Sequence, residues 1–161
     1  GPKCLGFMVP SLNLNASLSH TSVLPGNIAF VSQSDSLFTT VLDWAKTHGI
    51  GFSHVVSLGS RIDVGFSDVL DYLASDPLTR SILLYIESVR DARNFMSAAR
   101  AASRNKPVLV IRPGQALAAM LAETGAPECR NRVCPGDIYD LAFRRAGMLR
   151  VQTVDLSLIH I

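Results

Sequence analysis

The sequence predicts an α/β fold built on a doubly wound parallel sheet, with helices packed on both faces. Short apolar runs alternate along the chain with segments of helical periodicity. The apolar runs are continuous, as is typical of parallel strands that are buried on both faces. With 161 residues, of which 48% are hydrophobic, the chain is long enough to bury one sizeable core. We therefore expect one full domain whose parallel strands are joined by right-handed crossovers.

Strands and helices are expected in strict alternation, and each has its own start or stop signal. The first helix ends at Gly49, a residue that favours the left-handed conformation found after helix ends. The second helix has Asp63 as its expected N-cap and ends before Pro77. The expected strands are 27–31, 52–58, 82–86, 107–111 and an edge strand at 148–151, and the expected helices are 35–48, 66–73, 91–103 and 137–147.

In a sheet of this class, ligands bind beyond the carboxyl ends of the strands. The polar segments that follow the four inner strands are Ser32-Gln33-Ser34, Gly59-Ser60-Arg61, Glu87 and Arg112-Pro113-Gly114. The first of these segments passes straight into a helix with no turn residue in between. Such a junction directs unpaired backbone N–H groups at one spot, which is how proteins often bind phosphate. The alternative is that Ser34 is simply the N-cap and Asp35 strengthens the helix start.

Charge and composition argue against several classes of partner. The net charge of +2 and the lack of a long Lys/Arg block argue against nucleic acid, and no apolar run is long enough to span a membrane. The odd set of three cysteines indicates reduced thiols and a cytoplasmic protein. Cys129 and Cys134 have no second Cys/His pair that would complete a zinc site, so no metal is expected.

Several motifs resemble those of NDP-forming acyl-CoA synthetases, which are relatives of the succinyl-CoA ligase alpha chain. The similar segments are 1–6, 26–34, 42–45, 49–53, 57–59 and 83–87. The resemblance implies a flavodoxin-like, succinyl-CoA synthetase-like domain over residues 26–152. Residues 1–25 are then expected to be the end of a preceding CoA-binding domain and a linker. Residues 153–161 form an atypical tail, whose last six residues, 156–161, resemble translated adapter sequence and are left out of the fold prediction.

Two further segments, residues 11–17 and 93–107, resemble the branch of this family that is fused to a GNAT domain. Members of that branch are bacterial protein lysine acetyltransferases that use acetyl-CoA. The resemblance implies a larger parent with a CoA-binding domain, an ATP-grasp region that takes ATP or ADP, and a catalytic acetyltransferase domain. The partners it implies are acyl-CoA, protein lysine substrates reached through the GNAT domain, and further copies of the chain in a homo-oligomer.

In the ligase relatives, a histidine of this domain is phosphorylated and carries phosphate between two active sites. Glu87 matches the family position that orients the histidine ring. The histidine itself is expected in a His-Thr-Gly-Ala type segment, but the equivalent residues 122–126 read Ala-Glu-Thr-Gly-Ala. None of His20, His48, His54 and His160 stands at that place, so the sequence predicts that the phosphohistidine is absent and assigns no catalytic residue.

The resemblance also assigns two binding segments. Ser32, Gln33, Ser34 and Asp35 are interpreted as the remnant of a phosphate pocket. Asp35 stands where ligase relatives have a small residue, and its carboxylate would occupy the helix N-terminus and repel an incoming phosphate. Gly1, Pro2, Lys3 and Cys4 match a segment that helps to line the CoA pocket. Lys3 replaces the family's asparagine there, and it either pairs with a CoA phosphate or projects into solvent.

The primary expectation is a regulatory CoA-ligase-like domain of a protein lysine acetyltransferase, not catalytic by itself. The alternative is part of an ADP-forming acyl-CoA synthetase, which converts acyl-CoA, ADP and phosphate into the acid, CoA and ATP. The missing histidine argues against this alternative. A third reading is a flavodoxin-like module that binds FMN at its strand ends. No aromatic-flanked Ser/Thr phosphate loop follows the first strand to support it.

Overall fold

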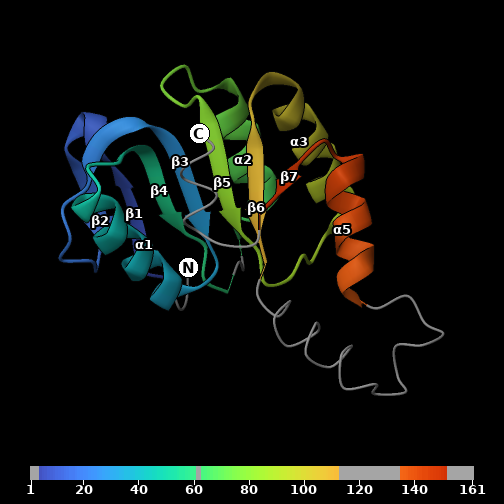
Figure 1. The fold of residues 1–161 in the computed structure, drawn as a ribbon, viewed down its shortest axis with the longest axis horizontal. Helices are drawn as coiled ribbons and strands as arrows, with labels where there is room; N and C mark the ends of the chain where they lie inside the picture. Colours follow the sequence, from blue (N-terminus) through green and yellow to red (C-terminus); the bar gives the residue numbers. More distant parts are fainter. Residues whose placement is uncertain (1–3, 61–62, 113–134, 152–161) are drawn as a thin grey trace.

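The computed structural model describes residues 4–60, 63–112 and 135–151, which form one mixed sheet with helices on both faces (Figure 1). The strands are β1 (Gly6–Val9), β2 (Leu14–Ser17), β3 (Leu24–Ser32), β4 (Gly51–Ser57), β5 (Ser81–Tyr85), β6 (Val108–Ile111) and β7 (Leu149–Arg150). The helices are the 3-10 helix η1 (Pro10–Leu12), α1 (Asp35–Thr47), α2 (Phe66–Ser75), α3 (Ala92–Asn105) and α5 (Pro135–Arg145). Within the described residues, the strand order is β2-β1-β4-β3-β5-β6-β7.

The parallel part of the sheet agrees with the sequence prediction. β3 pairs in parallel with β4 on one side and with β5 on the other. β6 continues the parallel ladder, and β7 adds the parallel edge strand that the sequence predicted near residue 148. The carboxyl ends of β3, β4, β5 and β6 therefore meet at one edge of the sheet, which we call the carboxyl edge.

The antiparallel hairpin formed by β1 and β2 was not predicted. β1 pairs with β2 and also with β4, so residues 6–17 extend the same sheet. Gly6 permits this pairing because its φ is +108°, and a side chain at this position would collide with the carbonyl oxygen of Ala16. The predicted domain boundary at residue 26 stays a prediction, but the segment before it forms part of this sheet.

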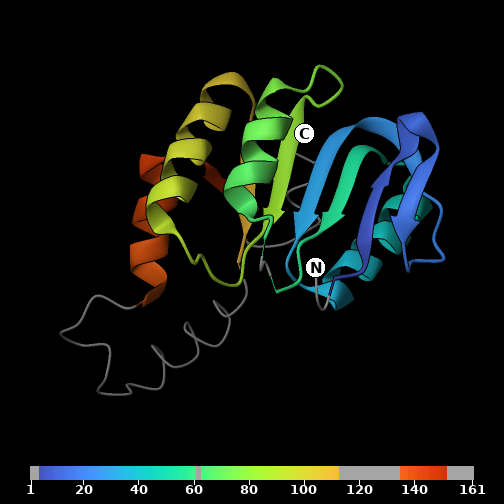
Figure 2. The same ribbon diagram turned by 180° about the vertical axis from the view of Figure 1, so that it is seen from behind.

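Two clusters of buried side chains fill the space on the two faces of the sheet. α1 covers one face, and α2 and α3 cover the other, as the two opposite views show (Figures 1 and 2). The α1 side is filled mainly by aromatic and branched residues, including Phe30, Phe38, Phe52 and Leu83. The opposite side includes Leu70, Leu84, Phe95 and Phe143, the last of them from α5. Helices on both faces confirm the doubly wound α/β class.

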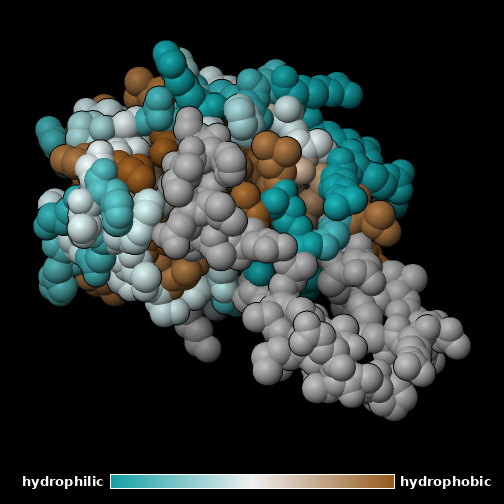
Figure 3. All heavy atoms as spheres, in the orientation of Figure 1, coloured by the Kyte–Doolittle hydropathy of each residue, from teal (hydrophilic) through white to brown (hydrophobic). Residues whose placement is uncertain are grey.

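On the side of β1, β2 and α1, hydrophobic atoms lie interspersed with polar ones (Figure 3). Among the described helices, none has the length and apolar character needed to cross a bilayer.

The N-cap of α2 is Gly65, so the prediction of Asp63 was wrong. The reason is that the carboxylate of Asp68, inside the first turn, accepts a hydrogen bond from the backbone N–H of Gly65 at 2.8 Å.

Candidate functional site

The abrupt junction between β3 and α1 is closed by serine side chains. The buried hydroxyl of Ser32 accepts from the backbone N–H of Ser34 at 3.1 Å and donates to its carbonyl oxygen at 2.8 Å. This local pairing replaces the turn residue that the sequence lacks. Ser34 then caps α1, because its hydroxyl accepts from the backbone N–H of Leu37 at 3.4 Å. The N-cap interpretation of Ser34 is therefore confirmed.

Gln33 joins the ends of two neighbouring strands. Its side-chain oxygen accepts from the backbone N–H groups of Glu87 at 2.6 Å and Ser88 at 3.1 Å. The backbone N–H of Gln33 donates to the carbonyl oxygen of Tyr85 at 3.2 Å. The loop that bears the exposed carboxylate of Glu87 is thus attached to the end of β3.

Asp35 lies in the first turn of α1 and accepts a hydrogen bond from the hydroxyl of Ser57 at 2.8 Å. The same hydroxyl oxygen accepts from the backbone N–H of Leu5 at 3.1 Å. The ends of β3 and β4 and the entry to β1 therefore meet at this carboxylate. Ser57 opens the family-like segment 57–59, but the sequence assigned it no role in the site, although its place at the end of a predicted strand was a usable signal. That Ser32, Gln33, Ser34 and Asp35 form a phosphate-pocket remnant stays a prediction.

Tyr85 and Glu87 are close enough to influence each other electrostatically. Burial raises the pKa of the Tyr85 hydroxyl above its ordinary value, and the negative charge of Glu87 adds to this effect. Tyr85 therefore stays neutral at physiological pH and can act there as a hydrogen-bond donor. A neutral phenol and an exposed carboxylate thus lie together at the carboxyl edge.

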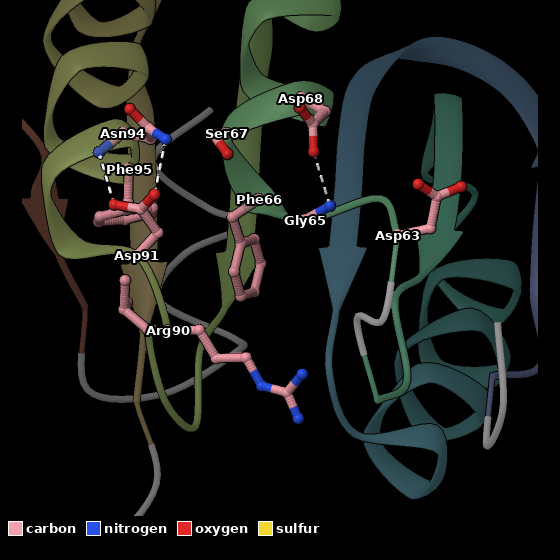
Figure 4. Close-up of a pocket in the computed structure, with 10 residues that line it drawn as sticks. Asp63, Gly65, Phe66, Ser67, Asp68, Arg90, Asp91, Asn94 and Phe95 are labelled. Atoms are coloured by element: carbon pink, nitrogen blue, oxygen red, sulfur yellow. Dashed lines mark hydrogen bonds between the residues drawn. The ribbon is translucent and has the colours of Figure 1, made fainter.

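A pocket of about 260 Å³ lies between the N-termini of α2 and α3 (Figure 4). Its floor is apolar and includes Phe66 and Phe95, whose rings meet edge to face with centroids 6.2 Å apart. Asp68 and Asp91 line it as well, but both carboxylates cap the helices that carry them. Because these carboxylates offset the positive helix ends, the pocket has no strong preference for anions at that point. Arg90 extends along its lower side in this view.

Arg112 and Tyr139 form a second cluster near this pocket, and the sequence did not predict their contact. The guanidinium carbon of Arg112 lies 3.9 Å from the centre of the Tyr139 ring, as in a cation–π pair. The hydroxyl of Tyr139 accepts from the backbone N–H of Val89, which also lines the pocket. The only sequence signal for Arg112 was its position after a predicted strand.

His54 lies in a buried polar cluster away from the carboxyl edge. Its Nε2 atom is 3.3 Å from the Tyr72 hydroxyl, and its Nδ1 atom is 3.5 Å from both Thr79 Oγ1 and Asp76 Oδ2. Lys106 completes this His54 cluster by donating to the carbonyl oxygens of Leu73 and Asp76. α2 ends and β5 begins here, so the cluster lies at the amino ends of the strands and fastens the helix end.

Several predicted site residues fall outside the described residues. They are Gly1, Pro2 and Lys3 of the CoA segment, residues 122–126 where the histidine is missing, the cysteines 129 and 134, and the tail 153–161. Cys4 is described and half-buried. Within the described part of the chain, no group of three or more His, Cys, Asp or Glu side chains is arranged to hold a metal ion.

Comparison with known proteins identifies relatives over nearly the whole chain. An ADP-forming acetate–CoA ligase I of Archaeoglobus fulgidus is 38% identical over 155 residues, which is 96% of this chain and 22% of the relative. The alpha subunit of an ADP-forming acetate–CoA ligase I of Pyrococcus furiosus is 36% identical, with 96% of this chain and 33% of the subunit covered. The chain thus spans about a fifth to a third of the length of these relatives.

A solved structure of similar fold comes from Ca. Korarchaeum cryptofilum. It is a dinucleotide-forming acetyl-coenzyme A synthetase 1 in complex with phosphate and ADP. The two chains superpose with a TM-score of 0.82 at 32% identity, and the match covers 96% of this chain and 33% of the synthetase. The fold prediction of a flavodoxin-like, succinyl-CoA ligase-like domain is therefore confirmed.

These relatives contradict the primary functional expectation. The acetyltransferase assignment was wrong, because the two relatives described above are ADP-forming acetate–CoA ligases. The GNAT-fused branch that segments 11–17 and 93–107 suggested is not shown by these relatives. The matching family is described as the succinyl-CoA ligase like flavodoxin domain, and it covers residues 25–159. This chain belongs to the succinyl-CoA ligase-like flavodoxin domain family, as found in ADP-forming acetyl-CoA synthetases.

Proposed function

We propose that this chain is the succinyl-CoA ligase-like domain of an ADP-forming acyl-CoA synthetase. The parent enzyme converts acyl-CoA, ADP and phosphate into the free acid, CoA and ATP. The observation that carries the proposal is the identity of 38% and 36%, over 96% of the chain, to two ADP-forming acetate–CoA ligases. Acetyl-CoA is therefore the first substrate to test.

The arrangement of the carboxyl edge supports a role in orienting a reacting group. Gln33 holds the backbone of the Glu87 loop, so the Glu87 carboxylate stands on an anchored segment. Glu87 is exposed, and no ion pair of its carboxylate is found among the described residues. An anchored, unpaired carboxylate can accept a hydrogen bond from an imidazole or another donor that arrives from outside this part of the chain.

The sequence places constraints on the phosphoryl transfer step. Residues 122–126 carry Glu123 where the ligase relatives have the phosphorylated histidine. Under our proposal, this domain supplies binding and orientation through its carboxyl edge. A nucleophile for a phosphoenzyme, where one forms, then belongs to another domain of the parent.

The experiment is an assay of the full-length parent protein with acetyl-CoA, ADP and phosphate. We expect ATP and free CoA to form in equal amounts, with no product when ADP or phosphate is left out. Longer acyl-CoA thioesters serve as further substrates in the same assay. Failure of every acyl-CoA to yield ATP would overturn the proposal.

The contribution of this domain is tested with a matched pair of variants. Glu87→Gln removes the exposed carboxylate but keeps the shape of the side chain, so we expect a lower kcat for ATP formation. Asp71→Asn makes the same chemical change at an exposed position of α2. It should leave the rate unchanged. Equal rates for both variants and the unaltered parent would show that Glu87 has no part in the reaction.

A further inference from the structure

The guanidinium group of Arg112 has an unusual environment. Its Nε atom is buried and has no hydrogen-bond partner. Arg112 forms no ion pair with any residue of the described part of the chain. A buried donor without an acceptor is costly, and arginine has no neutral form by which to avoid the cost. Such a group in a native fold calls for an explanation, and a ligand acceptor is one.

The position of Arg112 follows from the register of β6. Val110 packs in the cluster on the α2–α3 side, whereas Ile111 packs on the α1 side. Because side chains alternate along a strand, Arg112 turns back toward α2, α3 and α5. The backbone N–H of Ile86 donates to the carbonyl oxygen of Ile111 at 3.0 Å, so Arg112 and Glu87 leave neighbouring strand ends.

The Tyr139 ring holds the guanidinium by a cation–π contact, but the Nε–H group still has no hydrogen-bond acceptor. The guanidinium carbon is 3.9 Å from the ring centre, a distance that fits a cation over the ring face. The ring itself is fixed, because its hydroxyl accepts from the backbone N–H of Val89 and its neighbour Phe143 packs with centroids 5.9 Å apart. A guanidinium held in this way keeps its planar fork of donors in a defined orientation.

We propose that Arg112, held on the Tyr139 ring at the carboxyl edge of the sheet, binds an oxyanion. The ligand is a phosphate or a carboxylate group, because both offer paired oxygens that match the N–H fork of a guanidinium. The site differs from the predicted pocket remnant at Ser32–Asp35, which lies at the start of α1. It is also independent of the proposed function, although phosphate and carboxylate groups both take part in that reaction.

The first test labels arginines in the full-length parent with phenylglyoxal and maps the labelled residues by mass spectrometry. We expect inorganic phosphate, acetate or both to protect Arg112 from labelling. Separate titrations with phosphate and with acetate show which oxyanion the site prefers. The exposed residues Arg93, Arg100 and Arg104 of α3 are internal controls, whose labelling should not change. If neither anion slows the labelling of Arg112, the proposal is wrong.

Variants give a second test by titration calorimetry with the anion that protects best. Arg112→Gln should weaken binding by roughly 10- to 100-fold, because it removes a charged hydrogen-bond donor. Arg112→Lys keeps the charge without the fork and should give an intermediate affinity. Tyr139→Phe retains the ring and should preserve binding, whereas Tyr139→Leu should weaken it.

Arg93→Gln is the matched control for loss of charge, since Arg93 is exposed on α3 and forms no ion pair within the described residues. Thermal melts establish that each variant is folded. Unchanged affinity in folded Arg112→Gln would overturn the proposal. This outcome leaves the proposed function intact, because ATP formation from acyl-CoA is measured separately.

Discussion

The side-chain oxygen of Gln33 lies 2.6 Å from the backbone nitrogen of Glu87, 54 residues further along the chain. This contact links the strand end that leads into α1 with the loop that follows β5. It also assigns Gln33 a structural role that its resemblance to a phosphate-binding residue did not suggest. The orientation of Glu87 depends on Gln33, and this dependence can be tested.

Replacing Gln33 by methionine removes the acceptor and keeps the length of the side chain. We expect the free energy of unfolding to fall by only about 1 kcal/mol, because water can replace the lost acceptor for the two exposed backbone N–H groups. Gln33→Glu keeps an acceptor oxygen and is the control. Hydrogen exchange at Glu87 and Ser88 should accelerate in the methionine variant alone. Equal exchange in both variants would contradict the anchoring role.

Asp35 and Ser34 have different roles at the start of α1, and substitutions should separate them. Ser34→Ala removes the N-cap and should cost roughly 1 kcal/mol of stability, whether or not phosphate is present. Asp35→Gly removes the carboxylate that Ser57 contacts and should cost about 0.3–1 kcal/mol through the lost helix-dipole interaction alone. If Asp35 occupies the helix N-terminus in place of phosphate, this variant should also bind phosphate more strongly.

Thermal melts with and without phosphate measure both effects, since an anion that binds only the folded state raises Tm. Ser57→Ala is the control that breaks the contact with Asp35 and leaves the carboxylate in place. If phosphate raises the Tm of Asp35→Gly no more than it raises that of the unaltered protein, Asp35 does not exclude phosphate. The junction would then serve only as a capped helix start.

The His54 cluster makes stability depend on pH. Burial lowers the pKa of His54 below 6.5, and Lys106 lowers it further, whereas Asp76 opposes this shift. As the pH falls below 6.5, the unfolded chain therefore binds a proton at His54 that the folded protein does not yet bind. The contribution of His54 to the free energy of unfolding is fully present above pH 6.5 and is lost as the pH falls toward the pKa of the folded state.

Asp76 adds a second loss of stability at lower pH. Burial by itself raises the pKa of this carboxyl, but hydrogen bonds from Thr79 and the backbone N–H of Leu78, with the nearby positive charges, bring it below 3.8. The contribution of Asp76 to the free energy of unfolding is present above pH 3.8 and disappears as the pH falls through the pKa of the folded state.

Tm measured against pH should therefore decline in two stages. His54→Gln should remove the first stage, whereas His20→Gln, at an exposed position, should retain both.

The predictable part of the fold was the part that repeats a simple pattern. The buried strands β3 to β6 and their helices follow from continuous apolar runs and helical spacing, which reflect burial on both faces. The β1–β2 hairpin was missed because its stability depends on pairing with β4 and on the close approach at Gly6, neither of which leaves a periodic signal. The contact between Gln33 and Glu87 was missed for the same reason, since only the folded sheet brings them together.

The sequence predicted where the residues of the candidate site lie, but not which residues they contact. Parallel strands bring their carboxyl ends to one edge, so Ser32, Glu87 and Arg112 were expected there without any knowledge of their partners. The functional error had a different origin. The missing histidine argued against a ligase, whereas the similarity of the whole chain to ligases indicates one. A surface nucleophile can be lost without disturbing the buried core, so its absence bears on activity and says little about family.

The absence of the family's histidine at residue 123 should leave this domain without a phosphohistidine. We expect that the full-length parent, incubated with radiolabelled ATP or with acyl-CoA and labelled phosphate, carries no acid-labile, base-stable phosphate in this domain. The structure gives reasons for two of the remaining histidines. Both ring nitrogens of the buried His54 lie near polar partners, and His48 stacks on Trp44 while its Nδ1 atom contacts a backbone carbonyl oxygen.

Glu123→His tests whether the loss of this one residue explains the absence of label. Residue 123 lies outside the described residues, but its segment matches the place of the family's histidine in sequence. A neutral imidazole is a better nucleophile toward phosphorus than a carboxylate at neutral pH, so the variant should acquire acid-labile phosphate on residue 123. Glu123→Gln is the matched control and should stay unlabelled. Phosphate on His20, His48 or His54 of the unaltered parent would show that another histidine has taken over the relay.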